Sequence, residues 1–337
     1  MADKVKHGLA PWSKGRGIRT VCVLTSGGDA PGMNAAIRAV VRAGIQEGFR
    51  MMGCRRGFRG LLHGDILELD AHSVSGQVQR GGTFLMTARS EEFNTPEGVQ
   101  KAFDICRQFG IDALVVIGGD GSFRGALDLA RMGLPVIGIP STIDNDIGCS
   151  EYSIGFDTAV NTAMEAIDKL RDTATSHERC SCIEVMGRRT GYIALNVGVS
   201  CGAEVILIPE VEMNFEKDVE HRLLESRSKD RYHYVVVVAE GVGDTVEISN
   251  RIEKQTGIES RVTILGHVQR GGSPTTRDRV TASLMGARAI KSLLSCEYGR
   301  VVSHQRGRII TIEIEEALQM TKSISQDELS TAYKIAI

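Results

Sequence analysis

ALVVIGGDGS at residues 113–122 and LPVIGIPSTIDND at residues 134–146 are the two stretches of this chain that decide its fold. Each is a short apolar run, rich in Val and Ile, that ends in a loop of Gly or Pro with acidic residues. Such runs are typical of buried parallel strands, and an open α/β sheet binds its ligand beyond the carboxyl ends of its strands. The sequence therefore predicts an α/β protein with a ligand site at these two loops.

Both loops carry groups suited to phosphate chemistry. The glycines of the first loop let backbone amides approach a phosphate, and Asp120 can face a metal ion. In an extended segment Thr142, Asp144 and Asp146 would share one face. A hydroxyl and two carboxylates opposite a phosphate cradle favour phosphoryl transfer.

Composition restricts the class of protein. The chain has 337 residues, 42% of them hydrophobic, and a formal net charge of -2. We expect two domains, and neither nucleic acid nor a membrane surface as the main partner. Residues 1–17 predict a loose extension rather than a secretory signal. The eight cysteines show no CxxC and no Cys/His zinc spacing, which predicts reduced thiols in a cytoplasmic protein.

A further phosphate site is indicated near the start. A predicted strand at 20–24 runs into a loop containing Gly27, Gly28 and Asp29, and a helical pattern covers 33–47. Strand, Gly-Gly turn and helix start give free N–H groups and a dipole that favour an anion. A tight turn with Asp29 as the helix cap explains the same residues equally well.

The second half alternates between strands and helices. After a helix predicted at 93–109, which precedes the strand at 113–117, the patterns predict helices at 156–171, 190–199, 215–227 and 245–256. They predict strands at 182–186, 205–208, 234–239 and 262–265. This series predicts a second parallel sheet, with the chain crossing near Gly155. Arg188, Glu240 and Arg270 follow predicted strands, where they suit the phosphate and a hydroxyl of a sugar phosphate. Each one alone is also explained as a surface charge.

Taken together, the motifs resemble those of the bacterial 6-phosphofructokinase family. The matching motifs occur in order from about Thr20 to about Leu294: residues 24–34, 118–122, 142–146, 184–188 and 266–274. The resemblance implies two Rossmann-like three-layer α/β/α domains with mostly parallel sheets and an active site in the cleft between them. It implies a larger nucleotide-binding domain of residues 18–155 and 268–320, and a smaller sugar-phosphate-binding domain of 156–267 and 321–337.

The implied reaction transfers the γ-phosphoryl group of ATP to the 1-hydroxyl of fructose 6-phosphate, giving fructose 1,6-bisphosphate and ADP. On the donor side, the resemblance has Asp120 hold Mg²⁺, Phe58 meet the adenine and Arg89 reach the phosphoryl group in flight. The remaining implied nucleotide contacts are Gly28, Gly121, Ser122 and Gly125.

On the acceptor side, the resemblance makes Asp144 the general base, with Thr142 at the transferring phosphoryl group and Asp146 assisting the metal. The implied catalytic set is Gly28, Arg89, Thr142, Asp144, Asp146 and Arg188. The implied fructose 6-phosphate contacts also include Met186, Gly187, Arg188, Glu240, His267 and Arg270. Arg179 and Arg261 would come from a neighbouring subunit, which implies a homotetramer.

An inter-subunit effector site for ADP or phosphoenolpyruvate is a further expectation. The matching positions are Arg38, Arg42, Arg171, Glu204, Lys229, Arg231 and His233, with Glu204 available for the metal of the effector. Gly76 stands where some family members have an acidic effector-site residue, and dispersed surface charges are the alternative interpretation.

The donor separates the main enzymatic alternatives. Members that use pyrophosphate typically carry Asp where this chain has Gly121 and Lys where it has Ser141, so ATP is predicted. Ser141 departs from the Gly of many ATP users, and a basic residue expected shortly before Lys101 is missing. A pyrophosphate-dependent phosphotransferase, a non-catalytic nucleotide or sugar-phosphate sensor and, more distantly, a lipid or NAD kinase are the alternatives.

Overall fold

The computed structural model describes residues 17–229 and 233–335, and these form two compact units. Unit 1 contains the chain up to Thr142, then Ile147–Gly155 and Ser273–Thr321. Unit 2 contains Ile143–Asp146, Phe156–Gly272 and the chain from Lys322 onward. Relative to the predicted domains, residues 143–146 and 268–272 belong to the smaller unit and Thr321 to the larger one. The predicted loose extension at 1–17 lies, except for Gly17, outside the described residues.

Unit 1 is built on a seven-stranded sheet with the order β11-β10-β5-β4-β1-β2-β3. Its strands are β1 Thr20–Thr25, β2 Arg50–Cys54, β3 Ile66–Leu69, β4 Ala113–Gly118, β5 Val136–Pro140, β10 Arg300–Gln305 and β11 Arg308–Glu313. The five inner strands are parallel, and β3 and β11 add antiparallel edges. The predicted strands at 20–24 and 113–117 are confirmed. The edge strands were not predicted.

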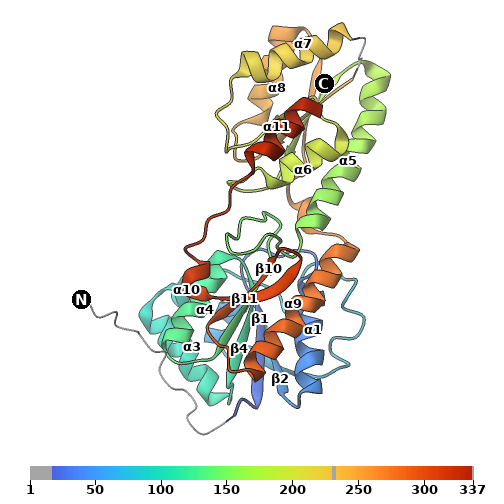
Figure 1. The fold of residues 1–337 in the computed structure, drawn as a ribbon. Coiled ribbons are helices and arrows are strands. Elements are labelled where there is room, and N and C mark those ends of the chain that lie inside the picture. The colour runs from blue at the N-terminus through green and yellow to red at the C-terminus, as the bar shows by residue number, and fades with distance from the viewer. Residues whose placement is uncertain (1–16, 230–232, 336–337) are drawn as a thin grey trace, which may run out of the picture. The chain divides into compact units, whose positions relative to one another are not determined.

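Helices cover both faces of this sheet. They are α1 Met33–Gln46, α2 Gly57–Leu62, α3 Pro96–Gln108, α4 Asp120–Arg131, α9 Thr276–Leu294 and α10 Ile314–Ala317. Helices α1 and α9 pack together on one face, with α3 and α4 on the other (Figure 1). The helix predicted at 93–109 begins only at Pro96, because Glu92–Asn94 forms a 3₁₀ turn and the Thr95 hydroxyl then caps α3 by accepting from the Gly98 amide.

Unit 2 is built on a four-stranded parallel sheet with the order β7-β8-β6-β9. Its strands are β6 Cys180–Val185, β7 Val205–Leu207, β8 Tyr234–Ala239 and β9 Ser260–Ile264. Its helices are α5 Phe156–His177, α6 Tyr192–Cys201, α7 His221–Ser228, α8 Thr245–Thr256 and α11 Gln326–Ile335, with a π-helical turn at Glu216–Glu220 and a 3₁₀ turn at Gly266–Arg270. The predicted class, α/β with two mostly parallel sheets, is confirmed.

The segment that follows β5 differs from the prediction. It is not an extended strand, because the backbone turns at Ile143–Asp144 and Asn145 adopts a left-handed conformation with φ of 52°. Burial nevertheless alternates along it: Thr142, Asp144 and Asp146 are half-buried, whereas the residues between them are buried. The three polar side chains therefore still share partial exposure.

No helix in the described ranges combines the length and the apolar character that a membrane span requires.

Candidate active site

In unit 1, two Gly-rich loops meet where the strand order reverses. From β1 the chain runs outward to β2 and β3, whereas from β4 it runs the other way to β5. The carboxyl ends of β1 and β4 are therefore a topological switch point, the place where open α/β sheets bind ligands. The Ser26 amide donates to the Ile117 carbonyl at 3.0 Å, so the loop containing Gly28 lies beside the loop containing Asp120.

Glycine is required where these loops touch. A Cβ at Gly118 would lie 2.4 Å from the Ser122 hydroxyl and 2.4 Å from the Ser26 carbonyl oxygen. Ser122, predicted to line the nucleotide, is 4% exposed and fills this space. By contrast, a Cβ at Gly119 or Gly121 would meet no atom within 4 Å. The start of α4 is therefore open, and the helix dipole favours an anion there.

Asp120 is the first residue of α4 and is half-buried. Within residues 17–229 and 233–335, no three His, Cys, Asp or Glu side chains form a group that could hold a metal. Mg²⁺ in phosphoryl-transfer sites is commonly held by one or two carboxylates together with substrate phosphates. One carboxylate beside two open glycine positions fits that set of ligands.

Side-chain hydrogen bonds fix the segment that carries Arg89 to the end of β1. The Thr25 hydroxyl donates to the Met86 carbonyl at 2.8 Å, and the Thr87 hydroxyl donates to the Gly27 carbonyl at 2.7 Å. Arg89 follows two residues later and is exposed. Unit 1 thus holds the segment just before Arg89 beside the loop of Gly28. The role of Arg89 stays a prediction.

Phe58 and Gly125 belong to the core of unit 1. The Phe58 side chain is 6% exposed and stacks on Phe93, with the ring centroids 4.1 Å apart. A Cβ at Gly125 would lie 2.8 Å from the Phe93 ring and 2.9 Å from the Phe58 ring. Close packing of these two rings therefore explains why residue 125 is a glycine. The adenine contact of Phe58 stays a prediction.

In unit 2, the predicted sugar-phosphate residues follow three neighbouring strands. Met186, Gly187 and Arg188 follow β6, Glu240 follows β8, and His267 and Arg270 lie just after β9. The Glu240 amide donates to the Val185 carbonyl at 2.9 Å, and the Leu265 amide donates to the Glu184 carbonyl at 3.1 Å. Because the three strands are parallel and adjacent, these residues gather at one edge of the sheet.

Two side-chain acceptors, the exposed Glu240 and the buried Gln269, shape the turn after β6. Gly187 and Arg188 have φ of 146° and 58°, and Glu240 Oε1 accepts from both of their amides, at 3.1 and 2.6 Å. Gln269 is fully buried, and its Oε1 accepts from the Met186 amide at 2.8 Å. Gln269 lies inside a motif quoted above, but its type and position alone did not single it out.

Asp144 lies in the electrostatic field of four other predicted residues. Burial raises the pKa of Asp144 to about 6, with further increases from the charges of Asp146 and Glu240, while Arg270 and Arg188 lower it. The Asp144 carbonyl also accepts from the Thr190 hydroxyl at 3.1 Å. A carboxylate with this pKa is ionised at neutral pH and can take up a proton.

Comparisons with known proteins agree with this geometry. A family model described as phosphofructokinase matches residues 20–293. The chain belongs to the phosphofructokinase family. It is 55% identical over 310 residues to the ATP-dependent 6-phosphofructokinase of Clostridium botulinum strain Hall, covering 92% of this chain and 97% of that protein. The Clostridium tetani protein of the same name is 54% identical over 303 residues, or 90% of this chain and 95% of that protein.

A solved structure supports the fold. The phosphofructokinase of Saccharomyces cerevisiae superimposes with a TM-score of 0.85 at 35% identity, covering 95% of this chain. The chain spans about half the length of that yeast protein, 48%.

Two residues that the phosphofructokinase resemblance assigns to the sugar phosphate lie at the opposite edge of the sheet. Arg179 precedes β6 and Arg261 is near the start of β9. Glu259 accepts from Arg179 Nε at 2.8 Å and also pairs with Arg261. The six residues of β6 separate Arg179 from Met186, roughly 20 Å of parallel strand. Within one chain the structure does not bring Arg179 and Arg261 to Arg188.

The predicted effector residues are distributed over both units. Arg38 and Arg42 lie on α1 of unit 1, whereas the other described members belong to unit 2. The Arg171 guanidinium donates to the Cys201 carbonyl, and the Lys229 ammonium pairs with Glu225 at 3.0 Å.

Glu204, expected to be available for the metal of the effector, is buried and accepts from the Val235 amide at 2.7 Å. His233 is half-buried, and Arg231 lies outside the described residues. The effector site stays a prediction.

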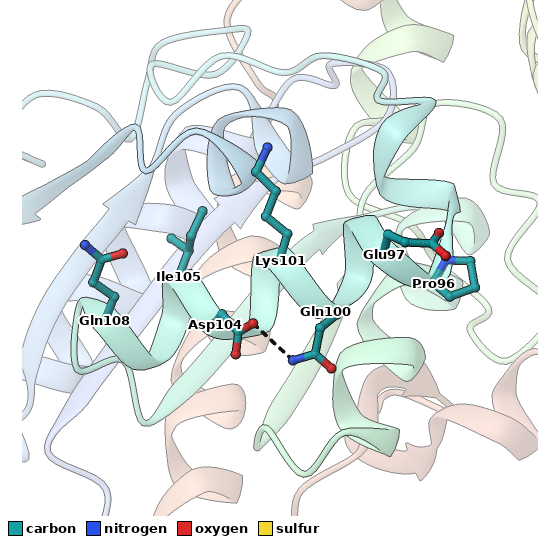
Figure 2. Close-up of a pocket in the computed structure, with 7 residues that line it drawn as sticks. All are labelled: Pro96, Glu97, Gln100, Lys101, Asp104, Ile105 and Gln108. Atoms are coloured by element: carbon teal, nitrogen blue, oxygen red, sulfur yellow. Dashed lines mark hydrogen bonds between the residues drawn. The ribbon is translucent and has the colours of Figure 1, made fainter.

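A pocket on the exposed side of α3 contains none of the predicted site residues (Figure 2). Its lining comes from that helix alone: Pro96, Glu97, Gln100, Lys101, Asp104, Ile105 and Gln108. Lys101 pairs with Glu92 at 2.8 Å, and the Gln100 amide donates to Asp104 at 3.2 Å.

Proposed function

We propose that this chain catalyses the ATP-dependent phosphorylation of fructose 6-phosphate at its 1-hydroxyl, producing fructose 1,6-bisphosphate and ADP. The observation that carries the proposal is the placement of the family residues. Gly28, Asp120 and Gly121, assigned to the donor, lie at the switch point of unit 1. Of the residues assigned to the sugar phosphate, Met186, Gly187, Arg188, Glu240, His267 and Arg270 lie at one edge of the sheet of unit 2. The chain segment with Thr142, Asp144 and Asp146 passes from the first unit to the second.

On the donor side, the loop of Gly28 and the open start of α4 would receive the phosphates of ATP, with Gly121 leaving room for the nucleotide. Asp120 would hold Mg²⁺, assisted by Asp146. The ion supplies positive charge that neutralises the donor phosphates. Arg89, exposed and fixed near Gly28, would neutralise the phosphoryl group during transfer.

On the acceptor side, Arg188 and Arg270 supply cations for the sugar phosphate, and Glu240 supplies an acceptor for a sugar hydroxyl. Both turn amides end on Glu240 Oε1, so Oε2 is the atom proposed to meet that hydroxyl. Asp144 would accept the proton of the 1-hydroxyl as its oxygen attacks the γ-phosphorus.

A second copy of the chain completes the acceptor site in this proposal. Arg179 and Arg261 lie at the far edge of the same sheet, so they would serve a sugar phosphate bound by a neighbouring subunit. This supports the homotetramer that the family resemblance implies.

ATP is the proposed donor and the cytoplasm the proposed compartment. Neither Gly121 nor Ser141 matches the pyrophosphate pattern. Ser141 is 1% exposed, and its hydroxyl donates to the Ile154 carbonyl at 3.3 Å. This buried hydrogen bond explains the presence of a hydroxyl at position 141. None of the eight cysteines, all of which are among the described residues, forms a disulfide, which suits a reducing compartment.

The test is an assay of the purified chain with fructose 6-phosphate and either Mg-ATP or Mg-pyrophosphate, following fructose 1,6-bisphosphate. We expect the higher specificity constant with Mg-ATP. A higher value with pyrophosphate would overturn the donor, and no product with either donor would overturn the activity. Asp144→Asn serves as the matched control for contaminating kinase.

A further inference from the structure

The turn between Asp144 and Asp146 is held by a residue far away in the sequence. Lys322 Nζ donates to the Asn145 carbonyl at 3.0 Å, across 177 positions. Both residues belong to unit 2. Lys322 lies beyond residue 293, where the match to the family model ends, and no sequence motif marked it.

The backbone at this turn is held by two side chains. Asn145 is buried and adopts φ of 52°, in the left-handed region that asparagine takes more often than other non-glycine residues. The carbonyls on either side of the Asn145 Cα are each held by a side chain, that of Asp144 by Thr190 and that of Asn145 by Lys322. These two peptide planes set the directions in which the Asp144 and Asp146 side chains leave the backbone.

Lys322 is itself held in place. Its ammonium lies over the Tyr192 ring, 4.9 Å from the centroid. Tyr192 begins α6 and follows Thr190 by two residues, so the same loop positions both donors. Immediately before Lys322, the Met320 backbone packs against Gly148, where a Cβ would lie 2.0 Å from the Met320 carbonyl oxygen. After Lys322, α11 packs on α6 (Figure 1).

We propose that Lys322 is a positioning residue that holds the Asp144–Asp146 turn in the geometry needed for proton acceptance and phosphoryl transfer. The proposal rests on the function proposed above. A charged donor makes a stronger and shorter hydrogen bond than a neutral one, and misplacing a reacting group by about 1 Å can cost about 100-fold in rate. The C-terminal segment therefore contributes to catalysis without touching either substrate.

The first test is Lys322→Met, which keeps an unbranched side chain one atom shorter and removes the N–H groups. We expect kcat to fall on the order of 10–100-fold, with little change in KM for either substrate. Lys322→Arg, which can still donate and lie over Tyr192, should recover most of kcat. Lys334→Met, an exposed lysine on α11, is the matched control and should resemble wild type. An unchanged kcat in Lys322→Met overturns the proposal.

A double-mutant cycle separates positioning from general stability. In an Asp144→Asn background, Lys322→Met should reduce the residual rate much less than in wild type, because the main group it positions is gone. An equal reduction in both backgrounds overturns the proposal.

A second readout needs no activity. Hydrogen exchange in a peptide covering residues 143–147 should become faster in Lys322→Met and not in Lys334→Met. Unchanged exchange overturns the positioning role, even if the chain phosphorylates fructose 6-phosphate. If exchange is faster in Lys322→Met but the wild-type protein lacks that activity, Lys322 still stabilises the turn, and only the proposed function is refuted.

Discussion

Glu240 accepts a hydrogen bond from the backbone amide of Arg188 at 2.6 Å. One carboxylate thus both shapes the turn after β6 and influences the pKa of Asp144. The same carboxylate stabilises a left-handed residue, with Arg188 at φ of 58°, and its charge raises the pKa of Asp144. Glu240 therefore has two separable effects, one through its acceptor oxygen and one through its charge.

The pH profile distinguishes these two effects. Glu240→Gln keeps an acceptor oxygen for the turn but removes the negative charge, so the pKa of Asp144 should fall. We expect the acid limb of kcat/KM, near pH 6 in wild type, to move to lower pH. Arg270→Gln removes a cation that lowers this pKa and should move the limb the other way. If the acid limb of the kcat/KM profile stays at the same pH in both variants, Asp144 is not the group whose titration produces it.

Asp144→Asn tests the base itself. The amide has nearly the same shape but cannot take up the proton, so kcat should fall on the order of 10²–10⁴-fold. KM for fructose 6-phosphate should change little, because the substrate contacts assigned to Arg188, Glu240 and Arg270 are intact. Steady-state kinetics with Mg-ATP measure both values. Near-normal turnover would remove Asp144 from this role.

The same variant should be more stable than wild type at alkaline pH. The folded-state pKa of Asp144, about 6, is above its ordinary value of 3.8. The contribution of Asp144 to stability is therefore fully present below about pH 4 and is lost as the pH rises through 6. The neutral asparagine avoids this loss, which amounts to roughly 1–3 kcal/mol of unfolding free energy. Calorimetry at pH 8 should show a higher Tm for Asp144→Asn, with the difference shrinking towards pH 5. A Tm for Asp144→Asn below that of wild type at pH 8 would contradict this prediction.

The sequence predicted the strand ends well because apolar runs and the Gly-rich loops after them are local signals. Asp120, Arg188 and Glu240 could all be found in that way. The supports of Asp144 could not, because Thr190 and Lys322 act through backbone carbonyls and have no motif of their own. The packing of Gly125 could not be predicted either, because the Phe58 and Phe93 rings that a Cβ at 125 would meet come from other elements of the fold.

Gly121→Asp tests the donor. A Cβ at Gly121 would meet no atom within 4 Å, so the substitution should leave the fold intact. The new carboxylate would repel the phosphates of ATP beside Asp120, and kcat/KM for Mg-ATP should fall on the order of 10²-fold. Gly121→Ala is the uncharged control and should lose much less. Ser141→Lys is a poor companion, because it would place an ammonium at a buried position. Equal losses in the Asp and Ala variants would show that charge is not the cause.

Complementation between subunits tests the role of Arg179. Arg179 lies at one edge of the sheet of unit 2, whereas Arg188, Glu240 and Arg270, whose charges affect Asp144, lie at the other. Arg179→Ala and Asp144→Asn should therefore impair different halves of a shared site. Each variant alone should be nearly inactive. In a hybrid, the Asp144 of an Arg179→Ala chain can meet the Arg179 of an Asp144→Asn chain, and random mixing restores roughly a quarter of the sites.

Co-expression with two different tags, followed by purification through both, isolates the hybrids. Each variant co-expressed with itself is the control. Hybrids no more active than their parents would place Arg179 outside the neighbouring site, and its pairing with Glu259 would then be only structural.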